Sequence, residues 1–72
     1  MHKLDITKEH CPMTMVKVKL KLAQIDTGEQ LDVLLYGEEP LNNVPRTAEE
    51  EGHKILSITP EGEDHHVVIE KR

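Results

Sequence analysis

The sequence contains a single cysteine, Cys11, and its position favours a reactive thiol. Pro12 follows it directly, and proline is favoured at the first position of a helix, so we expect a helix to begin just after the sulfur. The unpaired backbone N–H groups and the positive dipole end at a helix start both stabilise a thiolate. Cys11 is therefore the candidate nucleophile, and we expect it to be accessible to solvent.

Basic side chains near Cys11 would add to this effect. Lys8 and His10 precede the thiol and Lys17 follows it, and positive charge close to a thiol favours its ionised form. The alternative is that Cys11 is an inert, buried small side chain, as many lone cysteines are. The polar residues 8–10 immediately before it argue against that alternative.

Composition limits the setting in which this thiol works. A chain of 72 residues predicts one domain, residues 1–72. One cysteine permits no internal disulfide and argues against an oxidising compartment, where small domains are usually rich in disulfides. The N-terminus does not resemble a secretory leader, and no apolar run exceeds four residues, far below the roughly 20 that a membrane span requires. We expect a cytoplasmic protein with no membrane span.

Charge and aromatic content argue against a nucleic-acid partner. Asp and Glu number 14 against 9 Lys and Arg, which gives a net charge of −5. Binding to phosphates requires a basic face, and single-stranded nucleic acid also requires aromatic rings for stacking, of which the chain has only one Tyr. The five histidines have no metal-ligand spacing, and His65 and His66 would point to opposite faces of a strand. We expect neither a metal nor a cofactor.

The segment after Cys11 fits two secondary structures. Residues 16–22 alternate strictly between apolar and polar, which favours a strand. Over residues 13–25, however, Met15, Val18, Leu22 and Ile25 lie on one helical stripe, beside a second stripe of apolar residues that would widen the apolar face. Periodicity alone does not decide between the two. Pro12 and the length of the segment favour the helix.

The remaining elements predict a small α/β fold. The expected order is a strand at 3–7, the helix at 13–25, a strand at 30–36, a helix within 41–51, and strands at 53–59 and 65–70 around a turn at 60–64. The second helix is expected to begin near Val44, with Pro45 in its first turn and Gly52 as its stop. Short right-handed connections then predict a two-layer α/β sandwich of order β-α-β-α-β-β, with a four-stranded mixed sheet and both helices on one face.

This arrangement resembles the TusA/SirA-like sulfur-carrier family over nearly the whole chain. The family pattern Cys-Pro-x-Pro corresponds here to Cys11, Pro12, Met13 and Thr14, with Thr14 in place of the second proline. Further landmarks of the resemblance are Glu38-Glu39-Pro40-Leu41, Val44-Pro45 and Glu50-Glu51-Gly52-His53.

The resemblance implies that Cys11 carries sulfur as a persulfide. Such proteins accept sulfur from a cysteine desulfurase or rhodanese-type donor protein. They pass it to an acceptor protein in tRNA thiolation, cofactor synthesis or sulfur metabolism, as carriers rather than stand-alone enzymes. We expect Met13 to form an apolar rim near the thiol and Thr14 to satisfy backbone donors in the first helical turn. The alternatives are a regulatory or interaction module in which Cys11 is incidental, a redox-active thiol protein, which lacks a second cysteine, and RNA binding, which the acidic charge opposes.

Overall fold

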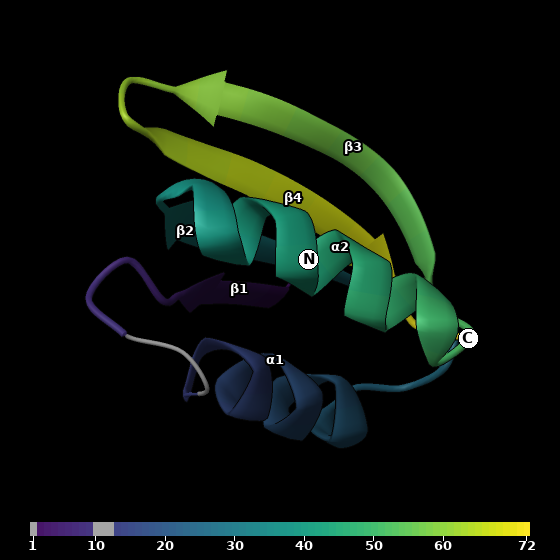
Figure 1. The fold of residues 1–72 in the computed structure, drawn as a ribbon. Helices are drawn as coiled ribbons and strands as arrows, with labels where there is room; N and C mark the ends of the chain where they lie inside the picture. Colours follow the sequence, from purple (N-terminus) through teal and green to yellow (C-terminus); the bar gives the residue numbers. More distant parts are fainter. Residues whose placement is uncertain (1, 10–12) are drawn as a thin grey trace.

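The computed structural model describes residues 2–9 and 13–72, which form two helices packed on a four-stranded sheet (Figure 1). The elements are β1 (His2–Asp5), α1 (Met13–Gln24), β2 (Gln30–Tyr36), α2 (Glu38–Glu50), β3 (Lys54–Glu61) and β4 (Asp64–Glu70). The strand order is β1-β2-β4-β3, with β1 parallel to β2 and the other neighbours antiparallel. This confirms the predicted β-α-β-α-β-β sandwich with a mixed sheet. No helix among the described residues is long and apolar enough to cross a membrane.

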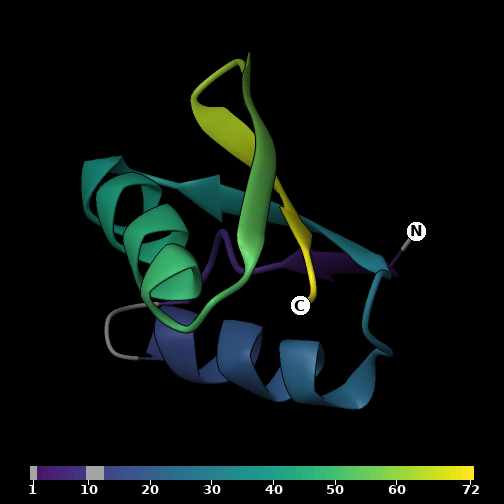
Figure 2. The ribbon, with the colours of Figure 1, turned by 90° about the vertical axis from the view of Figure 1, so that its right-hand side faces the viewer.

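Both helices cover the same face of the sheet, and the core lies between the layers (Figure 2). Most side chains of β2 and β4 that point towards the helices are fully buried, whereas their alternate neighbours are half-buried or exposed. The buried set consists of Leu31, Val33, Leu35, Val67 and Ile69. Because every large side chain in this core is aliphatic, branched residues fill the interior without any aromatic ring.

The ambiguous segment after the thiol is a helix, as predicted. Val18 and Leu22 are buried on its inner side, and Ile25 is buried just beyond its end. The expected wide apolar face is wrong in one respect, because the second stripe, which includes Val16 and Leu20, is exposed. The alternation of residues 16–22 did not make this segment a strand, because the helix buries Val18 and Leu22 on one face and brings Ile25 into the core just beyond its end.

Helix α2 begins earlier than the sequence suggested. It starts at Glu38 rather than near Val44, so Pro45 lies inside the helix rather than in its first turn. Pro40 is the proline that occupies the first turn, where the backbone N–H has no partner within the helix. Pro45 removes one internal hydrogen bond, but it is buried beside Val44, and this packing offsets the loss.

Strands β3 and β4 form a hairpin that extends beyond the helices (Figure 1). The expected turn at 60–64 is shorter in the structure: Glu61 pairs with Asp64, which leaves Gly62 and Glu63 as the loop. Gly62 has a φ of 62°, a conformation that suits glycine in a tight hairpin. Strand β3 lies at an edge of the sheet, contains Pro60, and has an irregular register between Ile55 and Ser57.

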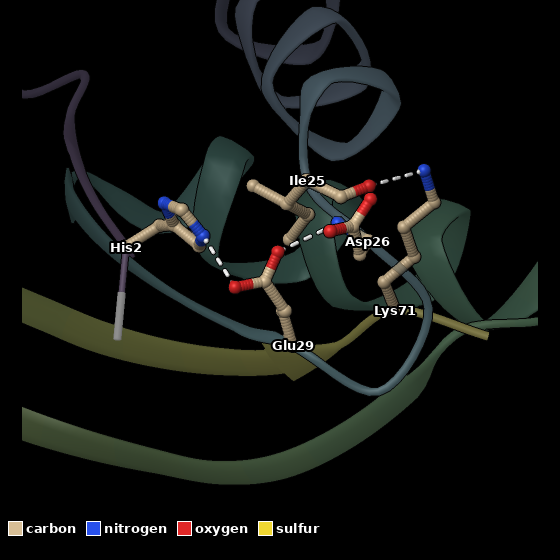
Figure 3. A network of polar contacts seen from close by, with 5 residues as sticks. All are labelled: His2, Ile25, Asp26, Glu29 and Lys71. Atoms are coloured by element: carbon tan, nitrogen blue, oxygen red, sulfur yellow. Dashed lines mark hydrogen bonds and ion pairs between the residues drawn. The ribbon is translucent and has the colours of Figure 1, made fainter.

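A group of polar contacts fixes the end of α1 against the sheet (Figure 3). Lys71 Nζ donates to the Ile25 carbonyl over 2.7 Å, and one Glu29 oxygen accepts from the Asp26 N–H over 2.7 Å. The other Glu29 oxygen lies 3.1 Å from His2 Nε2. Both contacts lower the pKa of Glu29, and the hydrogen bond from the Asp26 backbone has the larger effect. These contacts tie the α1–β2 connection to both β1 and the residue that follows β4.

Candidate functional site

The candidate nucleophile lies in the connection between β1 and α1. His10, Cys11 and Pro12 are outside the described residues, and the predictions for them therefore stay predictions. Helix α1 begins at Met13, two residues after Cys11, as the sequence analysis expected. The described residues on either side define the setting of the thiol: the end of β1 and residues 6–9 on one side, and the first turns of α1 on the other.

The chain leaves β1 in a fixed conformation. One carboxylate oxygen of Asp5 accepts from the Thr7 backbone N–H over 2.9 Å and from the Thr7 hydroxyl over 2.7 Å. These two hydrogen bonds lower the pKa of Asp5, and the bond from the Thr7 backbone has the larger effect. Ile6 is buried, and its N–H donates to the Leu34 carbonyl over 2.9 Å. The approach to the thiol is therefore anchored in the core up to Ile6.

Of the basic residues predicted to lie near the thiol, Lys17 forms an ion pair with another described residue and Lys8 does not. Lys17 is paired with Glu9, which links the segment before the thiol to the second turn of α1. This carboxylate offsets the charge of Lys17, so Lys17 contributes less to the local potential than its sequence position suggests. Lys8 is exposed and makes no ion pair within residues 2–9 and 13–72.

The first turn of α1 exposes one of its predicted site residues and buries the other. Met13 is 45% exposed, whereas Thr14 is only 4% exposed and packs inward. Val16 (41% exposed) and Leu20 (58% exposed) continue from Met13 at helical spacing. We call Met13, Val16 and Leu20 the α1 stripe. It is an apolar surface that begins two residues after Cys11 and faces away from the core.

A second polar cluster, which the sequence analysis missed, lies on the sheet face opposite the helices. His66 Nδ1 lies 2.9 Å from Asp32 Oδ1, and His66 Nε2 lies 2.5 Å from Glu61 Oε2. As predicted, His65 faces the other way, and its Nδ1 is buried without a described partner. The imidazole of His66 separates the two carboxylates, and no group of three potential ligands within residues 2–9 and 13–72 is arranged to hold a metal ion. Period-two alternation could have placed His66 and Asp32 on one face, but their pairing depends on the strand register.

The fold and the sequence before α1 define a class: a small two-layer α/β domain in which a Cys-Pro pair directly precedes the first helix. Residues 2–71 match the family model described as "Sulfurtransferase TusA". The chain is 41% identical over 69 residues to the "Putative sulfur carrier protein" of Archaeoglobus fulgidus, covering 96% of this chain and 78% of that protein. It therefore belongs to the TusA family.

Two further comparisons agree with this assignment. A protein of Methanocaldococcus jannaschii with the same description is 32% identical over 71 residues, covering 99% of this chain and 95% of that one. The crystal structure of a SirA-like protein from Desulfitobacterium hafniense superposes with a TM-score of 0.84 at 22% identity, covering 97% and 96% of the two chains. At that identity the crystal structure supports the fold alone.

Proposed function

We propose that this protein is a sulfur carrier that holds sulfane sulfur as a persulfide on Cys11. The observation that carries the proposal is family membership over residues 2–71 together with a Cys-Pro step directly before α1. A helix start supplies unpaired N–H groups and a positive dipole end, which favour the thiolate that this chemistry requires. We further propose that residues 1–72 act as one domain in the cytoplasm.

The transfer needs no external oxidant or reductant. The Cys11 thiolate attacks the outer sulfur of a donor persulfide, one S–S bond forms as another breaks, and the donor leaves as its thiolate. The same exchange, with Cys11 as the leaving group, delivers the outer sulfur to an acceptor thiol. Both steps are thiol exchanges between proteins, so the partners are a donor protein, such as a cysteine desulfurase or rhodanese, and an acceptor protein.

The α1 stripe is the surface on which we propose that these partners dock. Its three exposed apolar side chains begin two residues after Cys11 in the sequence. An exposed apolar patch close to a reactive group is typical of a surface that binds another protein. Lys21 is half-buried one turn beyond Lys17 on the same helix, and Lys8 is exposed before the thiol. A partner with an apolar centre and an acidic rim would complement this surface.

Replacement of Cys11 by serine tests the chemistry. We expect Cys11→Ser to fold normally, because the two side chains are nearly isosteric, and to accept no sulfur. Intact mass after incubation with a cysteine desulfurase and cysteine should show one added sulfur on the wild type and none on the variant. Sulfur uptake by Cys11→Ser, or its full rescue of a deletion strain at normal protein levels, would refute the carrier role and favour a regulatory module.

Replacement of Leu20 by glutamate tests the docking surface. Leu20 is 58% exposed, so Leu20→Glu should leave folding intact while placing a negative charge in the stripe. We expect the second-order rate of sulfur transfer to fall by about tenfold, the effect of removing one to two kcal/mol of contact free energy. Thr27→Glu, an exposed change to the same side chain in the turn that follows α1 and outside the stripe, is the matched control. Equal rates for both variants would show that the stripe is not the docking surface.

A further inference from the structure

His66 lies at the centre of a cross-strand cluster that joins three strands. It projects from β4 on the sheet face that the helices leave open, and it contacts Asp32 on β2 through Nδ1 (2.9 Å) and Glu61 on β3 through Nε2 (2.5 Å). Its side chain is 31% exposed, and that of Asp32 is 18% exposed. One imidazole therefore connects the central strand β2 to the outer strand β3.

The protonation state of His66 decides how many of these contacts can form. Ionised carboxylates only accept hydrogen bonds, so both contacts require an N–H on each ring nitrogen. An imidazolium has two such groups, whereas a neutral imidazole has only one and its other nitrogen is an acceptor. Loss of the proton therefore removes one hydrogen bond and both ion pairs.

The charged groups around the cluster favour the protonated form. The side-chain bond to Asp32 raises the pKa of His66 most, the bond to Glu61 raises it further, and burial opposes them. From β1, Lys3 and Asp5 line the same hollow of about 160 Å³ as His66 and have opposite charges.

Two more titratable groups occupy the same face of the sheet. Asp64 lies two residues before His66 on β4, and Tyr36 is its register partner at the end of β2. Asp64 is an acidic side chain near the cluster, and Tyr36 places a phenol beside it.

The cluster is close to the end of the sheet that leads to the thiol. In the register, His66 is opposite Leu34 on β2, and Leu34 is opposite Asp5, the last residue of β1. The hairpin loop and residues 6–9, which follow β1, therefore lie at the same end of the molecule, on the left of Figure 1. Glu61 is the last residue of β3 before that loop, so its contact with His66 holds the hairpin end.

We propose that His66 is a pH-sensitive latch: its imidazolium ties the end of the β3–β4 hairpin to β2 through Glu61 and Asp32, and its deprotonation releases the hairpin end. Because the group gains its partners on folding, the latch is complete below the unfolded histidine pKa of about 6.5 and is lost as the pH rises through the higher folded value. The latch does not depend on sulfur chemistry. It therefore does not rest on the proposed function.

The latch is tested by NMR on the purified protein without partners. We expect the His66 ring to titrate above about pH 6.5. Amide exchange at residues 61–64, corrected for its intrinsic pH dependence and compared with β2, should be about two- to fivefold faster at about pH 8 than at about pH 5.5, as expected for a partly exposed ion pair. His66→Gln should abolish this difference, whereas His53→Gln, at the other end of β3, should keep it.

Asp32→Asn provides a second test of the latch in which the histidine itself is retained. It should lower the His66 titration midpoint, because the largest stabilising partner of the imidazolium is lost. A wild-type midpoint at or below about 6.5, or hairpin exchange that does not change with pH, would overturn the proposal. Sulfur uptake on Cys11 is measured separately, so failure of the latch and failure of the carrier role give different results.

Discussion

At the scale of single residues, the proposed chemistry depends on the sulfur of Cys11 and on the helix that begins two residues later. Residue type identified Cys11 as the candidate nucleophile, and α1 begins at Met13 as the Cys-Pro step predicts. The balance of charge around the thiol was harder to anticipate. Lys17 is paired with Glu9, a contact between residues eight positions apart that no local sequence pattern predicts.

The ionisation of Cys11 follows from this setting. We expect its pKa to lie below the unperturbed value of about 8.5, because the start of α1 and Lys8 both stabilise the thiolate. The rate of alkylation against pH gives the midpoint directly. Lys8→Gln should move the midpoint up by a few tenths of a unit, since an exposed charge is well screened. A wild-type midpoint at or above 8.5, the approximate free-thiol value, would contradict the dipole argument.

At the scale of elements, helix α1 contains two leucines with similar sequence neighbours, of which one is buried and the other exposed. Leu22 is 4% exposed and packs on the sheet, whereas Leu20 is 58% exposed on the α1 stripe. We expect Leu22→Ala to lower the free energy of unfolding by about 2–5 kcal/mol, as large-to-small core changes do. Leu20→Ala makes the same change of helix propensity and should cost less than about 0.5 kcal/mol. Urea denaturation of both variants measures the difference, and equal losses would show that the helix is rotated.

The elements also show where prediction from sequence reaches its limit. Strand and helix order could be predicted because apolar periodicity, Pro12 and the glycine turns are local features. The start of α2 could not, because a proline is compatible with both a first turn and a buried interior position, and only packing distinguishes Pro40 from Pro45. The cluster around His66 depends on which strands are neighbours, and no local pattern contains that information.

At the scale of the whole molecule, two kinds of ionisable group set opposite limits on stability. Asp5 and Glu29 have lowered pKa values, so their contributions are present above the unfolded values of 3.8 and 4.5 and are lost as the pH falls. His66 has a raised pKa, so its contribution is complete below 6.5 and is lost as the pH rises through the folded value. We therefore expect maximum stability between about pH 5 and pH 6.

Urea midpoints at several pH values measure this profile. The net charge of −5 also opposes folding at high pH through self-repulsion, so variants are needed to separate the causes. Glu29→Gln should reduce the slope on the acid side, where Asp5 still contributes, and His66→Gln should reduce the slope on the alkaline side. A wild-type midpoint that rises between about pH 6 and pH 8 would contradict the sign derived for His66.

The outer edge of β3 has a consequence for behaviour at high concentration. An open edge strand can recruit the same strand of another molecule and extend the sheet into fibrils. Here Pro60 has no N–H to offer a newcomer, the irregularity between Ile55 and Ser57 breaks the repeat, and Lys54 adds charge at one end. The β3 edge therefore offers no regular surface on which copies could stack beside the apolar stripe proposed for partners. Crowding should therefore not extend the sheet through this edge, which leaves the proposed docking stripe available for successive encounters.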